Sequence, residues 1–129
     1  MAPDSPQVPS SGRAWSSIRL ELATTGEFPR GSASRAYMLR LPLGLDDAID
    51  EATMRDMPAR ATVRRFWPSQ ADLSGHVITT PAGWAFVYDC GEPILQPMPP
   101  ALRLGKDVLL VEPDGSRLPF RIVSVLRLN

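Results

Sequence analysis

Cysteine, histidine and lysine are almost absent from this chain of 129 residues. Cys90 is the single cysteine, which excludes an internal disulfide and suits a reducing compartment. His76 is the single histidine, and one histidine with one cysteine falls short of a closed zinc site. The aspartates lack the spacing of a calcium-binding loop. We therefore expect no metal and no cofactor.

Long apolar runs are missing as well. The first residues contain prolines and serines without the apolar stretch that a signal peptide needs, and no later run is long enough to span a membrane. We expect a cytoplasmic protein that does not contact a membrane. The composition predicts a disordered tail over residues 1–14 and a single β-barrel-like domain over residues 15–129.

An excess of charge of either sign is also lacking, because 14 Lys and Arg residues balance 14 Asp and Glu residues. This balance makes nucleic acid a possible partner but not the favoured one. Lys106 is the only lysine, so arginine supplies nearly all of the positive charge. Arginine suits planar, bidentate contacts, but genomic base composition is the simpler explanation of such a bias.

Apolar residues that alternate with polar ones predict strands over residues 17–24, 35–41 and 61–67, the last stopped by Pro68. The predicted inward residues of the first two strands are Ile18, Leu20, Leu22, Tyr37, Leu39 and Leu41. Short strands with closely spaced turn signals predict a mainly β fold, either a small antiparallel β-barrel or a strongly curled sheet with one short helix.

The one helical segment lies within residues 46–57, where Asp50 suits an N-cap and Pro58 ends the helix. Its apolar residues are Ala52, Met54 and Met57. A helix of this length is unstable alone, so we expect it to lie on the sheet.

Two turns, at residues 80–83 and 112–115, share one pattern, with proline second and glycine fourth. The pattern predicts hairpins with three-residue loops closed by a left-handed glycine. In the second hairpin this register opposes Leu110 to Leu118, Val108 to Phe120 and Asp107 to Arg121. A two-residue loop would instead place apolar residues opposite polar ones, which favours the longer loop.

The same loop in the first hairpin opposes Thr80 to Trp84, Ile78 to Phe86 and His76 to Tyr88. One face would then gather Trp84, Phe86, Tyr88 and His76. Such a face is either ordinary core packing or a stacking site with a titratable edge, and clustered strand aromatics usually belong to the core. An enzyme would need His76 as the base for Cys90 or a serine, but no oxyanion hole is evident.

The densest basic and aromatic run is Arg64-Arg65-Phe66-Trp67. Alternation places Arg64 and Phe66 on one face and Arg65 and Trp67 on the other. Such a strand can bind phosphates through arginine while bases stack on the rings. The competing interpretation pairs both arginines with the acidic cluster Asp46, Asp47, Asp50, Glu51 and Asp56.

A weak anion-binding signal lies in the loop that contains Arg30, Gly31, Ser32, Ser34 and Arg35. It matches neither the P-loop nor the dinucleotide fingerprint, because no helix is expected to follow it.

The outer face of the second hairpin is apolar at Leu109, Val111, Val123 and Val125. A strand that is apolar on both faces is either covered by another layer or forms an interface. The interface interpretation predicts a protein partner or a homodimer that contacts these four residues.

The string TVRRFWP at residues 62–68, the following hairpin with its W-F-Y pattern, and the closing FRIVSV strand resemble a group of small uncharacterised bacterial proteins. The resemblance implies a self-contained bacterial domain, and it brings no activity, ligand or catalytic residue.

These observations favour a non-catalytic protein-interaction module. The first alternative is a binder of single-stranded nucleic acid or a phosphate ligand on the Arg and aromatic strand face, with Arg64, Arg65, Trp67, His76, Trp84 and Tyr88 as candidate binding residues. The second alternative is an enzyme that uses His76, and the sequence leans against it.

Overall fold

The computed structural model describes residues 14–89, 91–97 and 99–128. Its strands are β2 (Ala14–Leu22), β3 (Ser32–Leu43), β4 (Thr62–Phe66), β5 (Leu73–Thr80), β6 (Gly83–Tyr88), β7 (Ile94–Gln96), β8 (Asp107–Val111) and β9 (Arg117–Arg127). A short helix, α2 (Glu51–Asp56), and a 3-10 turn, η1 (Pro58–Arg60), connect β3 to β4. All neighbouring strands are antiparallel, in the order β7-β6-β5-β4-β3-β2-β9-β8.

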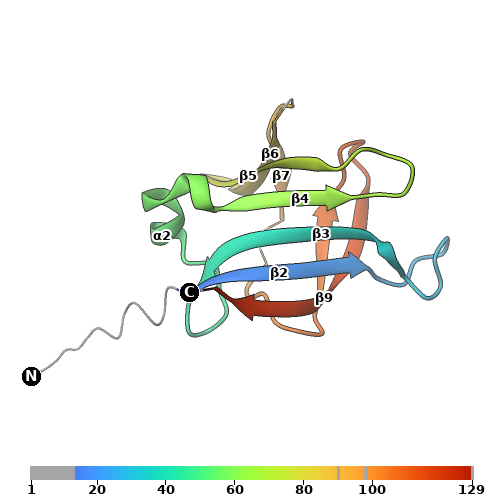
Figure 1. Ribbon diagram of the computed structural model, residues 1–129, viewed down its shortest axis with the longest axis horizontal. Helices are drawn as coiled ribbons and strands as arrows, with labels where there is room; N and C mark the ends of the chain where they lie inside the picture. Colours follow the sequence, from blue (N-terminus) through green and yellow to red (C-terminus); the bar gives the residue numbers. More distant parts are fainter. Residues whose placement is uncertain (1–13, 90, 98, 129) are drawn as a thin grey trace, which may run out of the picture.

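The sheet curls into a nearly closed barrel, which confirms the predicted mainly β fold with one short helix. Figure 1 shows β4, β3, β2 and β9 side by side, with α2 at one end of these strands. Because successive residues of a strand face opposite sides, one face of each strand fills the barrel and the other faces outward. The six inward residues predicted for the first two strands are all buried.

The barrel is closed between its two edge strands by the side chain of Gln96. Its amide Nε2 donates to the carbonyl of Val111 at 2.9 Å, and its Oε1 accepts from the Val111 N–H at 2.7 Å. Gln96 is 4% exposed. The side-chain amide therefore pairs with β8 as the backbone of another strand residue would, because it offers one donor and one acceptor.

The second hairpin has the predicted register. Val108 pairs with Phe120, Leu110 with Leu118, and the loop is closed by a hydrogen bond from the Glu112 N–H to the Ser116 carbonyl at 2.7 Å. Gly115 has a φ of 88°. This is the left-handed conformation that the turn requires and that glycine adopts without strain.

The predicted register of the first hairpin is wrong by one residue. Thr80 pairs with Gly83, so the loop has two residues, and Phe86 pairs with Val77 rather than Ile78. Gly75 then lies opposite Tyr88, where a Cβ would come within 2.0 Å of the Val87 carbonyl oxygen. Only glycine permits this close approach of the two strands.

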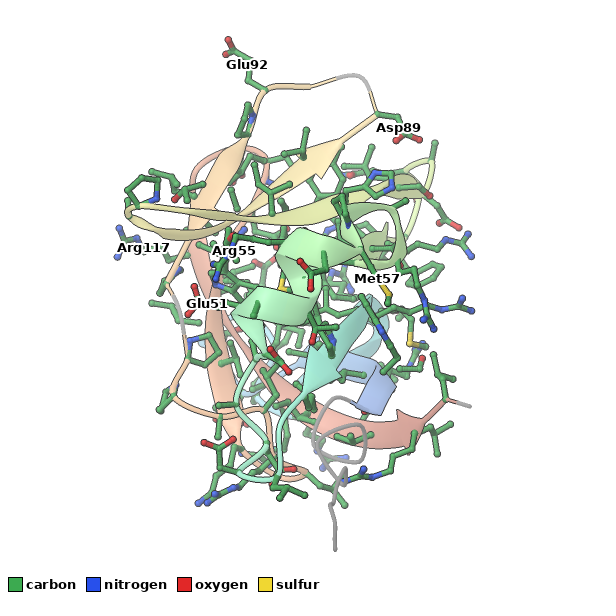
Figure 2. All side chains as sticks on the ribbon, turned by 90° about the vertical axis from the view of Figure 1, so that its left-hand side faces the viewer. Glu51, Arg55, Met57, Asp89, Glu92 and Arg117 are labelled. Carbon is green, nitrogen blue, oxygen red and sulfur yellow. The ribbon has the colours of Figure 1, made fainter. Side chains whose placement is uncertain are left out.

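Helix α2 begins as predicted, because the Asp50 carboxylate accepts a hydrogen bond from the Thr53 N–H at 3.1 Å. Met54 is buried and α2 packs against β3 and β5. Ala52 and Met57 were expected to face the sheet, but both are exposed because the buried side of this short helix holds only Thr53 and Met54. Figure 2 shows Glu51 and Arg55 on the helix, which lies in front of the sheet, and Met57 directly after it.

The predicted tail lies outside the described residues except for Ala14, at which β2 begins, and Cys90 also lies outside them. Within the described residues, no helix combines the length and the apolar character needed to cross a membrane.

Candidate functional site

The outer face of β2–β5 holds an open groove of about 560 Å³ that we call the outer-face groove. The side chains that define it are Ser17, Met38, Arg40, Thr62, Arg64, Phe66, Ser74, His76 and Asp89. The groove is wide open to solvent and crosses the strands, so it suits an extended ligand rather than an enclosed small molecule.

Strand register explains how residues distant in sequence meet in this groove. Thr62 on β4 pairs with Arg40 on β3 and with His76 on β5, so these three form one row across the outer face. In the next row, Arg64 lies between Met38 and Ser74. Neighbouring strands lie about 4.8 Å apart, so each row brings its side chains within reach of one ligand.

Positive charge in the outer-face groove is only partly neutralised. Arg64 lies 3.3 Å from Asp72 in an exposed ion pair, and its guanidinium carbon is 5.0 Å from the centre of the Phe66 ring. Arg40 is exposed and makes no hydrogen bond or ion pair with any described residue. His76 is exposed and likewise unpaired within the described part of the chain. Within the described residues, Arg40 is therefore an unpaired cation on the groove wall.

Asp89 supplies negative charge at one side of the groove. It follows β6, and its N–H donates to the Ser74 carbonyl at 2.9 Å. Figure 2 shows the Asp89 and Glu92 side chains pointing away from the barrel on either side of the β6–β7 connection. An anion in the groove therefore avoids the Asp89 side and is drawn toward Arg40.

A second group of polar residues lies inside the barrel, and we call it the buried cluster: Tyr37, Arg65 and Glu112. Arg65 donates to Oε1 of Glu112 through Nε at 3.1 Å and Nη2 at 2.7 Å, and the Tyr37 hydroxyl donates to Oε2. Glu112 is 3% exposed. Both carboxylate oxygens are thus occupied, which is the condition for burying this charge.

Two tyrosines beside this carboxylate are held in the neutral form. Burial, followed by the nearby Tyr88 and Glu112, raises the pKa of Tyr37 far above its usual range. Burial also raises the pKa of Tyr88 to about 12. The Tyr88 hydroxyl lies near that of Tyr37 but makes no hydrogen bond of ordinary geometry with the described residues. It is a buried polar group without a direct partner, which costs stability.

The six predicted binding residues fall on two sides of the sheet. Arg64 and His76 line the outer-face groove, whereas Arg65, Trp84 and Tyr88 are buried on the inner side. His76 was expected to face Tyr88, but the shorter loop of the first hairpin turns it outward to pair with Val87. These residues therefore do not form one site.

Trp67 follows β4 and is half-buried. The Arg65 guanidinium carbon lies 4.0 Å from the centre of its indole ring, and Phe120 packs beside it at 6.4 Å. The predicted alternation of Arg64 and Arg65 is correct, but the suggested acidic partners are not. Arg64 pairs with Asp72, which precedes β5, and Arg65 pairs with Glu112, which follows β8.

In the predicted anion loop, the hydroxyls mainly bind one another. Ser32 and Ser34 lie within 3.1 Å, and Arg35 donates to Ser32 at 3.2 Å while its guanidinium stacks on Phe28 at 4.2 Å. Arg35 also lines a small pocket of about 150 Å³ with Phe28 and Trp67. Arg30 and Gly31 do not line that pocket. Anion binding at this loop remains a prediction.

The apolar face of the second hairpin is only partly exposed. Leu109 is 41% and Val123 40% exposed, whereas Val111 is half-buried and Val125 packs against the core. An ion pair between Asp107 and Arg121, at 2.9 Å, lies between the two exposed residues on this face.

Sequence reasoning missed the three residues that matter most here: Arg40, Gln96 and Glu112. Arg40 carried a usable signal, because it occupies a polar position in the alternating stretch that contains Leu39 and Leu41. Gln96 and Glu112 carried no such signal, since a polar residue at the end of a predicted strand is common and does not indicate a buried contact.

The described residues contain no group of three or more His, Cys, Asp or Glu side chains that could hold a metal ion. No protein-family model, no curated protein and no solved structure matches the chain. The resemblance to small bacterial proteins therefore stays a prediction, and any function has to be argued from the site itself.

Proposed function

We propose that this protein is a non-catalytic binding module and that the outer-face groove holds an anionic ligand. The observation that carries the proposal is Arg40, an exposed arginine with no partner among the described residues, at the wall of an open groove. Surface arginines often pair with a nearby carboxylate, as Arg19, Arg55 and Arg103 do. Arg40 instead lies beside Thr62, in the row that ends at His76.

The groove also offers apolar contact next to its charge. Met38 and Phe66 are half-buried and line the same hollow as Arg40. A ligand with an acidic group and an apolar part would satisfy both, since charged groups fix orientation and apolar contact supplies affinity. This combination favours binding over catalysis, because the groove is open to water, whereas enzymes usually exclude water from the reacting groups.

A titration with inorganic tripolyphosphate at low salt tests the proposal. We expect saturable binding to the wild-type protein, and a loss of at least about ten-fold in affinity for Arg40→Ala, because a charge-assisted hydrogen bond contributes about 1.5–3 kcal/mol. The matched control is Arg117→Ala, which removes an exposed, unpaired arginine outside the groove. Equal losses in both variants, or no binding at all, would contradict the proposal.

A protein-interaction role through the second hairpin is the other candidate. Its support is the exposure of Leu109 and Val123 on one outer face. Sedimentation velocity over a wide range of concentrations tests self-association, which Leu109→Asp should abolish because it places a charge in the contact. A strictly monomeric wild-type protein would remove the homodimer form of this proposal.

A further inference from the structure

Two arginines lie over aromatic rings, Arg64 in the outer-face groove and Arg60 just before β4. Arg64 lies over Phe66, with 5.0 Å from its guanidinium carbon to the ring centre. Arg60 lies over Trp15, with a corresponding distance of 4.6 Å. Trp15 precedes the groove residue Ser17 by two positions on β2, so it belongs to the same outer face.

The free arginine of the groove lies between these two stacks. Thr62 is midway between Arg60 and Arg64 in sequence, and Arg40 on β3 pairs with Thr62. Arg60 ends η1 and Arg64 lies within β4, which begins at Thr62. In the order of these positions, the free Arg40 thus lies between two arginines that each rest over an aromatic ring.

A guanidinium that rests on an aromatic ring keeps its opposite face available. The side chain of Arg64 is 54% exposed, and Arg60 is exposed as well. Arginine is planar and stacks on flat rings, and nucleic-acid bases stack on guanidinium planes as they do on aromatic side chains. The ring beneath holds the plane in place, so less side-chain entropy is lost when a base binds.

We infer that the anionic ligand of the outer-face groove is single-stranded nucleic acid, with bases stacked on Arg60 and Arg64 and a phosphate bound by Arg40. This inference rests on the proposed function. An acidic peptide would supply carboxylates for Arg40 but nothing flat for the two stacks, and it is therefore the less suitable ligand.

The acidic side chains around the groove determine on which side of it the phosphates of the nucleic acid lie. Asp72 and Asp89 lie on the β5–β6 side and toward the Arg64 end, where they repel phosphates. The phosphates therefore run along the β3 side, past Arg40, and the bases point toward the stacks. With zero net charge on the chain, the long-range attraction is weak and the affinity rests on these few contacts.

Fluorescence anisotropy with a labelled twelve-nucleotide oligothymidylate tests the inference, with inorganic polyphosphate and a polyglutamate peptide of equal charge as competitors. We expect the oligonucleotide to bind more tightly than either competitor. Three cationic contacts predict that its affinity falls roughly 20-fold between about 50 and 200 mM salt.

The decisive variant is Arg60→Lys, which keeps the charge and removes the flat plane. We expect it to weaken oligonucleotide binding at least about five-fold, the effect of one lost stack, and to leave polyphosphate binding unchanged. Arg117→Lys, outside the groove, is the matched control and should change neither. Thermal unfolding of each variant verifies that the fold is intact.

The outcomes separate this inference from the proposed function. If polyphosphate binds as well as the oligonucleotide and Arg60→Lys changes nothing, the nucleic-acid inference is overturned while anion binding stands. If polyglutamate binds best, the ligand is an acidic peptide and the inference is overturned as well. If no anion binds even at low salt, both the inference and the proposed function are overturned.

Discussion

Arg65 and Glu112 form an ion pair across the interior of the barrel, with 2.7 Å between Nη2 and Oε1 and a separation of 47 positions in the sequence. Their strands are not neighbours in the sheet, because β3, β2 and β9 separate β4 from β8. Tyr37 on β3 binds the second oxygen of the same carboxylate. The pair therefore ties three parts of the barrel wall to one buried carboxylate.

Glu112→Gln should destabilise the protein by about 3–5 kcal/mol, because the Arg65 guanidinium would stay buried without its counter-charge. Urea unfolding at neutral pH measures this loss. The triple variant Arg65→Met, Glu112→Leu, Tyr37→Phe removes both charges and the hydroxyl that donates to Glu112. It should recover most of the stability, since apolar residues of similar volume replace buried ion pairs at little cost. A triple variant as unstable as Glu112→Gln would contradict this explanation.

The two buried tyrosines should respond in opposite ways to loss of the hydroxyl. Tyr37→Phe removes a hydrogen bond to a buried carboxylate and should cost about 1.5–3 kcal/mol. Tyr88→Phe removes a hydroxyl that has no hydrogen-bond partner of ordinary geometry, so it should be neutral or stabilise by about 1 kcal/mol. Equal losses of unfolding free energy in the two variants would show that the Tyr88 hydroxyl is bonded after all.

Stability should fall at alkaline pH, because burial raises the pKa of both Tyr37 and Tyr88, the latter to about 12. A group whose pKa is higher in the folded state contributes its full stability below the unfolded value of about 10. Above about pH 10 the unfolded chain releases protons that the folded protein keeps, so the free energy of unfolding decreases. For Tyr88 the loss is complete near pH 12.

The slope of that decrease reports the number of tyrosines involved. Two tyrosines give a decrease of about 2.7 kcal/mol per pH unit, and Tyr88→Phe should reduce it to about 1.4. Urea unfolding at several pH values above about 9 measures the slope, with tyrosinate absorbance as a direct readout of ionisation. A flat profile up to about pH 12 would contradict the prediction.

Gln96→Leu should cost about 1–3 kcal/mol, because it leaves the N–H and the carbonyl of Val111 unpaired. Amide hydrogen exchange is the specific measurement, and the Val111 amide should lose its protection while β2 and β3 keep theirs. Leu95→Ala, at the exposed neighbouring position, is the control and should change little. Unchanged exchange at Val111 in Gln96→Leu would show that another group closes the barrel.

The two hairpins show what the sequence could and could not predict. In the second hairpin only one register places Leu110 opposite an apolar residue, so the pattern decides it. In the first hairpin both Val77 and Ile78 are apolar, so Phe86 finds an apolar partner in either register. The close approach at Gly75 favours the shorter loop, and that is a matter of three-dimensional packing.

For the candidate site, the sequence could predict which face of its strand a residue lies on, but not which residues of other strands it meets. Alternation correctly separated Arg64 from Arg65, because a strand has a period of two. It could not indicate that Arg65 faces Glu112, because that contact depends on how the sheet curls. The outer-face groove likewise depends on the order of four strands, which no local pattern specifies.

Gln96 also bears on how the molecule behaves at high concentration. An unpaired N–H and carbonyl on a sheet edge are a template on which another chain can add a strand and start an aggregate. By occupying both groups of Val111, one glutamine side chain removes part of that template from β8. The residue that completes the barrel therefore also protects the protein against edge-to-edge association.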